Sequence, residues 1–386
     1  MIYLDNAATT QLDDDVLNEM LPFLEEEYGN PDTFCVVGET AADGVTHARE
    51  RVANAIGAAA PEIHFTSGGT EANNWILLSQ GRLGFWNIIT SKIEHHSITK
   101  PFEFVTALTD ECDGWYVDVD KSGRVGVESI VTTIGELRSH SSKPILVSVM
   151  MVNNETGTVQ PVTEIVQACK TFKDVYVHTD ATQALGKIDT SVEILGVDYM
   201  TLSSHKVHGP KGVGALYVRN GAPIEPMMFG GNQETNLRPG TTNVAGVVGF
   251  GKAAELAHLY FKQERMRDLE TLTGRFYLQL KACLNHIRLN GSPEHRTPNI
   301  ININVGVDCH TLMLKADELG VCVACGSACT SGDETPSHVL TSMGLTEDEA
   351  MSSVRISTSR FTTELDVSRS VRSLAQVIQS LRKDGV

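Results

Sequence analysis

VDYMTLSSHKVHGPKG, residues 197–212, joins a short apolar run to a polar, glycine-bearing exit. The run VDYMTL is typical of a buried strand. Lys206 follows it by four residues, behind a serine–histidine pair. Burial disfavours the charged form of a lysine and leaves an amine that can form a Schiff base with an aldehyde. A surface lysine in a turn is the alternative interpretation.

Apolar runs like this one recur along the chain, and helix-like segments such as residues 70–80 and 161–172 separate them. The runs cover residues 85–90, 144–152, 174–181, 198–205 and 213–218. Alternating strands and helices predict an α/β fold with a mostly parallel sheet. After about residue 255 the chain shows a long helical pattern, which predicts a second domain.

The composition limits the class of protein. A chain of 386 residues is long for a single core, so we expect two domains. The sequence has no apolar stretch of membrane-spanning length and no signal-peptide pattern, which predicts a cytoplasmic protein without a membrane segment. A net charge of −17 argues against non-specific nucleic-acid binding. Its eight cysteines, mostly isolated, predict reduced thiols rather than a disulfide framework.

Polar residues just after the apolar runs are candidates for a ligand site, because ligands bind beyond the carboxyl ends of parallel strands. Gly69 and Thr70 stand where a helix is expected to begin, and a helix N-terminus offers unpaired N–H groups to a phosphate. A plain turn with Thr70 as N-cap is the alternative. Ser203 and His205, beside Lys206, are further donors for a phosphate.

Asp180 closes the run at 174–181. A buried carboxylate there would keep a heterocyclic nitrogen protonated, although a helix cap or a salt-bridge partner is the simpler interpretation. Phosphate, ring nitrogen and aldehyde together describe pyridoxal 5′-phosphate (PLP). His95 follows another run and either stacks on the ring or is a solvated polar residue.

Two further residues are candidates for chemistry on a substrate. Cys329 lies in the polar segment ACTSGDETP (328–336), where an accessible nucleophilic thiol is expected. Cys325 and Cys329 have CxxxC spacing, but only His338 is near as a further ligand, so we predict no metal site. Arg355 suits a substrate α-carboxylate, with a surface salt bridge as the alternative.

These segments, in this order, resemble the cysteine desulfurases, PLP enzymes of the aspartate-aminotransferase fold. The matching segments are YLDNAATT (3–10), YGNP (28–31), FTSGGTEANN (65–74), EHHS (94–97), VNNETGTVQPV (152–162), HTDATQALGK (178–187), SSHKVHGPKGVGALYVR (203–219) and GSACTSG (326–332). The resemblance implies a type I PLP-dependent transferase fold and a homodimer. It also implies a large cofactor domain over residues 15–255, built on a seven-stranded, mostly parallel sheet, and a smaller α/β domain formed by residues 1–14 and 256–386.

The resemblance also implies a role for each candidate residue. Lys206 would form the Schiff base, Asp180 would face the ring nitrogen, and His95 would stack on the ring. The phosphate would be held by Gly69, Thr70, Ser203, His205 and, from the neighbouring subunit, Thr241. Asn154 and Gln183 would contact the phenolic oxygen, while Arg355 and Asn6 would bind the substrate.

The implied activity converts L-cysteine to L-alanine and moves the sulfur to Cys329 as a persulfide. An acceptor protein, such as an iron–sulfur scaffold, would then receive that sulfur. A selenocysteine lyase of the same fold is the alternative. The presence of Lys206 and Asp180 argues against a non-enzymatic scaffold, which needs neither residue. The chain departs from the family pattern at Cys35, which stands at the place of a histidine, and at Asn232 and Thr235.

Overall fold

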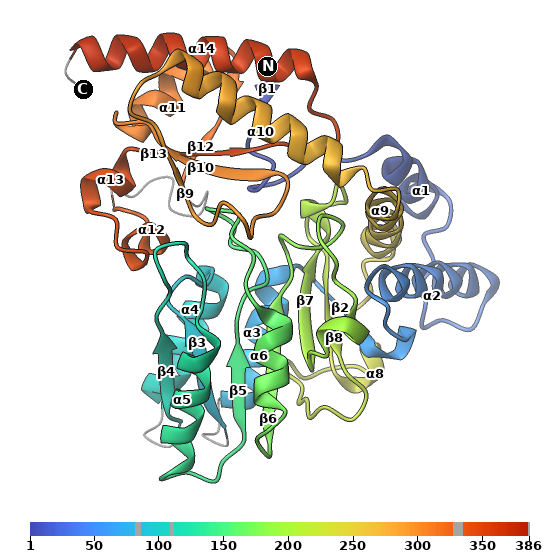
Figure 1. Cartoon of the computed structure of the whole chain (residues 1–386). Helices are drawn as coiled ribbons and strands as arrows, with labels where there is room; N and C mark the ends of the chain where they lie inside the picture. Colours follow the sequence, from blue (N-terminus) through green and yellow to red (C-terminus); the bar gives the residue numbers. More distant parts are fainter. Residues whose placement is uncertain (82–85, 109–111, 327–334, 385–386) are drawn as a thin grey trace.

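A computed structural model of the chain describes residues 1–81, 86–108, 112–326 and 335–384, and it is built around a large central sheet (Figure 1). Within these residues the sheet has seven strands in the order β2-β8-β7-β6-β5-β3-β4. The strands are β2 (Ile63–Thr66), β3 (Asn87–Ser91), β4 (Gly114–Val117), β5 (Ile145–Ser148), β6 (Val175–Asp180), β7 (Tyr199–Ser203) and β8 (Gly214–Val218). Among these seven strands, β8 runs in the opposite direction to the other six. The predicted α/β fold with a mostly parallel sheet is confirmed.

Helices cover both faces of this sheet, as a parallel sheet requires. One face packs on α3 (Gly69–Gly81) and α4 (His96–Leu108). The other face packs on helices from five parts of the chain. They are α2 (Val36–Ile56), α5 (Val127–Arg138), α6 (Val162–Cys169), α7 (Val192–Leu195) and α9 (Val244–Lys262).

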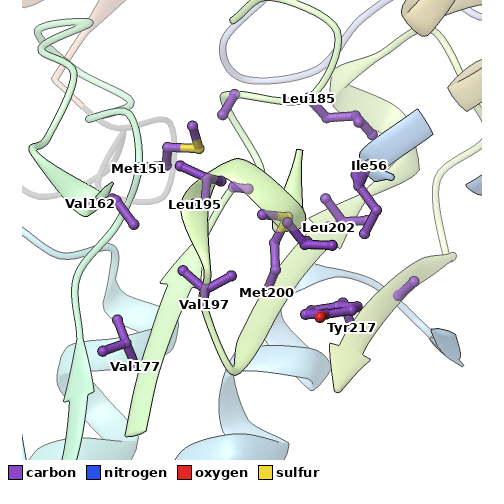
Figure 2. Packing of buried hydrophobic residues seen from close by; sticks show 14 of the residues in the cluster. Ile56, Met151, Val162, Val177, Leu185, Leu195, Val197, Met200, Leu202 and Tyr217 are labelled. Carbon is purple, nitrogen blue, oxygen red and sulfur yellow. The ribbon is translucent and has the colours of Figure 1, made fainter. Parts of the chain in front are cut away.

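Strand residues alternate between the two faces. Figure 2 shows Met200 and Leu202 of β7 packed near Ile56 of α2, whereas Tyr199 of the same strand belongs to the cluster under α3 and α4. Each of the three side chains is essentially inaccessible to solvent. The sheet is therefore fixed from both sides, and its strand ends form a rigid support.

Two of the predicted strands are shorter than their apolar runs. The run at 144–152 forms a strand only to Ser148. Its remainder is a buried loop, in which the Val149 and Met151 N–H groups donate to the carbonyls of His178 and Asp180. The run at 198–205 leaves the sheet after Ser203 and forms a 3₁₀ turn, η2 (Ser204–Lys206). The sequence did not reveal the shorter strands, because a buried loop can be as apolar as a buried strand.

A second body of structure combines both ends of the described chain. It contains the antiparallel sheet β12-β13-β10-β9 and the pair β1-β11. Their bounds are β1 (Ile2–Tyr3), β9 (Arg288–Asn290), β10 (Ile300–Asn304), β11 (Val321–Cys322), β12 (Ala324–Cys325) and β13 (Ser353–Ser357). Leu4 is buried in the same core as residues of α10 (Met266–Cys283), α11 (Cys309–Glu318) and α14 (Glu364–Asp384). The N-terminal segment thus packs with the C-terminal third.

The remaining described helices are α1 (Asp14–Glu25), η1 (Ala60–Glu62), α8 (Gln233–Asn236), α12 (His338–Ser342) and α13 (Glu347–Met351). The long helical pattern after residue 255 is broken: α9 ends at Lys262, α10 begins at Met266, and Glu264 between them has a left-handed φ of 57°. The domain boundary expected at residue 255 falls inside α9, and the domain division stays a prediction. None of the helices within the described ranges is long and apolar enough to cross a membrane.

One prediction about the cysteines is wrong. Cys309, the first residue of α11, and Cys325, in β12, form a disulfide with a Cα–Cα distance of 5.8 Å. Cys35, Cys112 and three other described cysteines are free. The sequence did not indicate the bridge because packing of α11 against β12, rather than residue spacing, brings the two thiols together.

Candidate active site

A cavity of about 210 Å³ lies beyond the carboxyl ends of the central strands. It brings together most of the residues that the sequence singled out: Gly69, Thr70, His95, Asn154, Asp180, Gln183, Ser203, His205, Lys206 and Arg355. Residues that the sequence analysis did not select also line it, among them Ala7, Ala8, Asn73, Ser97 and Thr182.

Three predicted residues are not among those lining the cavity. Asn6 is buried, and its Nδ2 donates to the carbonyls of Tyr3 and Ser357. Thr241 is exposed, and its predicted place in the neighbouring subunit's site stays a prediction. Cys329 lies outside the described residues.

Lys206 ends the η2 turn that follows β7. Its Nζ donates to the carbonyl oxygens of Ala7 and Ala8, at 2.7 Å in each case. The turn depends on Gly209, because a Cβ at that position would lie 2.0 Å from Ser204 Oγ. The glycine-bearing exit therefore lets the chain turn tightly enough to present the lysine to the cavity.

A cradle for an anion lies at the start of α3. A Cβ at Gly69 would approach Thr182 Oγ1 to 3.0 Å, so glycine leaves this space open. Thr182 Oγ1 is buried and has no hydrogen-bond partner within the described part of the chain. Unpaired N–H groups at a helix N-terminus, together with a buried hydroxyl lacking a partner, suit a phosphate.

His205 lies beside this cradle, with Nδ1 at 3.1 Å from Thr9 Oγ1. Burial and the neighbouring Lys206 lower the pKa of His205 to about 4. The ring is therefore neutral near pH 7 and can donate through one nitrogen while it accepts through the other.

Asp180 is held by two donors at the end of β6. Asn73 Nδ2 donates to Oδ2 at 2.7 Å, and the Thr182 backbone N–H donates to Oδ1 at 2.9 Å. The side chain is 7% exposed. Asn73 was missed from the sequence, although it belongs to the TEANN segment that follows Gly69. A carboxylate fixed in this way is a suitable partner for a protonated ring nitrogen.

His95 and its neighbour His96 lie in different environments. His95 lines the cavity, and its Nδ1 lies 2.8 Å from Ser97 Oγ. Burial lowers the pKa of His95, which favours a neutral ring. His96 instead stacks on His338, with ring centroids 4.9 Å apart. Of the two histidines, His95 is therefore the one at the cavity.

Arg355 is 1% exposed, so the surface salt bridge considered as an alternative is wrong. Its Nη2 forms an ion pair with Asp5 Oδ1 at 2.7 Å, and its Nη1 donates to the Asn154 carbonyl at 3.0 Å. Nε has no hydrogen-bond partner among the described residues. A buried guanidinium at the cavity wall with an unpaired N–H suits a carboxylate.

These features fit PLP as a group. The cradle at Gly69 suits the phosphate, Asp180 suits the ring nitrogen, and Lys206 suits the aldehyde. The exposed departures from the family pattern, Cys35 and Thr235, do not line the cavity. Within the described ranges, no group of three or more His, Cys, Asp or Glu side chains is arranged to hold a metal ion.

Comparison with known proteins finds relatives that match nearly the whole chain. Residues 2–369 match the family described as Aminotransferase class-V. The chain is 40% identical to a protein named cysteine desulfurase IscS from Dictyoglomus turgidum, over 99% of this chain and 95% of that protein. A cysteine desulfurase IscS from Clostridium botulinum is 41% identical over the same shares. A solved structure described as a NifS-like protein is 35% identical, with a TM-score of 0.88 over 98% of this chain and all of that one.

Proposed function

Because the chain belongs to the cysteine desulfurases of the class-V aminotransferase family, we propose that it converts L-cysteine to L-alanine with Lys206 as the cofactor lysine and Cys329 as the sulfur acceptor. The observation that carries the proposal is the cavity in which Lys206, Asp180 and Arg355 meet. Asp180 ends β6, Lys206 ends η2 and Arg355 lies in the middle of β13, and each side chain offers a different chemistry.

The residues that would hold PLP surround this cavity. Gly69, Thr70, Ser203, His205 and Thr182 would bind its phosphate, Asp180 its ring nitrogen, His95 its ring face, and Asn154 and Gln183 its phenolic oxygen. When bound, PLP supplies an electron sink for the charge left on the substrate's α-carbon.

The chain's own residues then divide the remaining work. Asp180, held by Asn73 and Thr182, stabilises positive charge at a ring nitrogen. Lys206 Nζ moves the substrate's α-proton, since it is an amine that lines the cavity. Arg355 orients the substrate by binding its α-carboxylate through the Nε–H that has no partner among the described residues.

Cys329 is assigned from the family resemblance, and the described residues on either side of it support the assignment. Ser337 Oγ donates to Glu155 Oε2 at 2.5 Å. A Cβ at Gly326 would lie 3.4 Å from the same oxygen. Glu155 directly follows Asn154, which lines the cavity. Gly326 and Ser337, which flank the segment that contains Cys329, therefore both lie next to the proposed site.

The experiment is a peptide-mapped mass of the holoenzyme after incubation with L-cysteine and no reductant. We expect one added sulfur on the peptide that contains Cys329, together with alanine in solution. In Cys329→Ser the added sulfur disappears while PLP stays bound. Cys322→Ser serves as the matched control and retains the modification. Sulfur on another cysteine in the wild type, or turnover of L-selenocysteine alone, contradicts the proposal.

The oligomeric state, partner and location are finer parts of the proposal. We propose a homodimer in which Thr241 completes the phosphate site of the partner, supported by large apolar side chains such as Phe34 and Phe229, which are 104% and 82% exposed. A sulfur-acceptor protein, for example an iron–sulfur scaffold, and a cytoplasmic location rest on the sequence interpretation. Sedimentation of the holoenzyme checks the dimer, and a monomer that binds PLP normally contradicts it.

A further inference from the structure

Lys206 forms part of the wall of a second, small cavity of about 40 Å³, as well as of the proposed active site. This rear cavity is also lined by Asn6, Lys187, His208, Tyr260 and Arg360. None of these five residues lines the proposed active site. Lys206 thus lines two cavities, the proposed active site and a rear cavity that Lys187 also lines.

Lys187 is connected to Lys206 through hydrogen bonds. Its Nζ donates to Gln183 Oε1 at 3.3 Å, and Gln183 Nε2 donates to the Ala7 carbonyl at 2.8 Å. The same carbonyl accepts from Lys206 Nζ at 2.7 Å. The backbone at Lys187 is also fixed, because Gly186 packs so closely on α9 that a Cβ there would lie 2.6 Å from Ala257 Cβ. Gln183 and the Ala7 carbonyl therefore link the amines of Lys187 and Lys206.

The charge balance of the rear cavity is unusual. Lys187 forms no ion pair with any described residue, and Arg360, the other cation on that wall, is paired with Asp13. A desolvated ammonium without a counter-ion is costly when a second ammonium lies nearby. Burial, with a further contribution from Lys206, lowers the pKa of Lys187 to about 7.

We propose that Lys187 is a positioning residue for Lys206 and that the two amines hold one proton between them. Lys187 gives up its proton to solvent while Lys206 is charged, and it takes a proton up when Lys206 becomes neutral. The inference rests on the proposed role of Lys206 and deepens it. In this arrangement Lys206 cycles between its two protonation states while the total charge of the pair stays constant.

Other titratable groups that face Lys187 do not account for a titration near pH 7. Burial is the main cause that lowers the pKa values of His205 and His208 to about 4, so both rings are already neutral. Burial also raises the pKa of Tyr260 above its ordinary value, which keeps the phenol protonated. Arg360 remains charged and is paired with Asp13.

The first test measures Lys187 directly in the holoenzyme. The rate of acetylation by a small acylating reagent is followed against pH by peptide mapping, because only the neutral amine reacts. We expect a half-reactive pH near 7 for Lys187, and a higher value in Lys206→Ala because the like charge is gone. Lys252, which is paired with Glu255, is the internal control in the same digest. An ordinary lysine value for Lys187, or no change in Lys206→Ala, overturns the proposal.

The second test uses the visible absorbance of bound PLP, whose pH midpoint reports the protonation of the group formed with Lys206. Lys187→Arg places a permanent charge behind Lys206, so we expect the midpoint to fall by about one pH unit. Lys187→Met removes the charge, and the midpoint should be no lower than in the wild type. Equal midpoints in all three proteins contradict the coupling. A chain that binds no PLP, or binds it without turning over L-cysteine, instead contradicts the proposed function.

Discussion

Arg355 and Asp5 form an ion pair whose Nη2–Oδ1 distance is 2.7 Å, with the arginine side chain almost fully buried. Asp5 belongs to the N-terminal segment, whereas Arg355 lies in β13. The pair fixes the guanidinium of Arg355, which lines the cavity and whose buried Nε has no partner among the described residues. The orientation of the proposed carboxylate site thus depends on an aspartate that the sequence did not single out.

Asp5→Asn is expected to raise the KM for L-cysteine more than it lowers kcat. The change removes a charge-assisted hydrogen bond to Arg355, and loss of such a bond corresponds to a change of about tenfold or more. Steady-state kinetics with L-cysteine check this split. The control is Glu364→Ala, which removes an exposed ion pair with Arg275 and should change neither constant. Unchanged kinetics in Asp5→Asn contradict the orienting role.

Lys206→Ala is expected to abolish covalent attachment of PLP and all turnover of L-cysteine. The amine is the group assigned both to the aldehyde and to the α-proton, and alanine can supply neither function. Borohydride treatment followed by peptide mapping checks the attachment, since it fixes the cofactor to its lysine. Lys211→Ala, in the exposed turn nearby, should remain labelled at Lys206. Labelling of another lysine in the wild type contradicts the assignment.

The sequence predicted the parts of the site that follow from strand position. Asp180 ends one apolar run and Lys206 follows another, and the carboxyl ends of parallel strands meet at one edge of a sheet. It did not predict Asp5 or Thr182, because their roles depend on contacts between distant segments. The Cys309–Cys325 disulfide was missed for the same reason. Asn6 was assigned from the family resemblance; its Nδ2 donates to the Ser357 carbonyl in β13, and its role in substrate binding stays a prediction.

Glu94 is expected to make the stability of the fold depend on pH. Its side chain is fully buried, and burial raises the pKa of Glu94 from 4.5 to about 8. The folded state therefore binds more protons than the unfolded state between these values, so the free energy of unfolding should fall as pH rises from about 5 to about 8. Chemical denaturation across this range checks the trend.

Glu94→Gln should flatten this dependence, because glutamine keeps the shape and an oxygen that accepts from the Met150 N–H but does not titrate. Glu103→Gln, at an exposed position on α4, is the matched control and should leave the slope unchanged. A slope that persists in Glu94→Gln assigns the effect to another group.

Loss of the Cys309–Cys325 disulfide is expected to lower the free energy of unfolding. The bridge joins residues 16 apart, and closing a loop of this size restricts the unfolded chain by about 3 kcal/mol. Denaturation of the wild type with and without a thiol reductant measures the effect. Cys309→Ser and Cys325→Ser should be less stable and insensitive to the reductant. Cys283→Ser changes an exposed free thiol and should behave like the wild type.

The contacts of Ala7 and Asp5 set an order of events during protein synthesis. Ala7 supplies a carbonyl to Lys206, while Asp5 must wait for Arg355, 350 residues later. A nascent chain that has already emerged with Lys206 and the whole central sheet still lacks the arginine that would select its substrate. During synthesis, the residues proposed to hold the cofactor in one subunit therefore emerge before the arginine proposed to bind the substrate, which is added with β13.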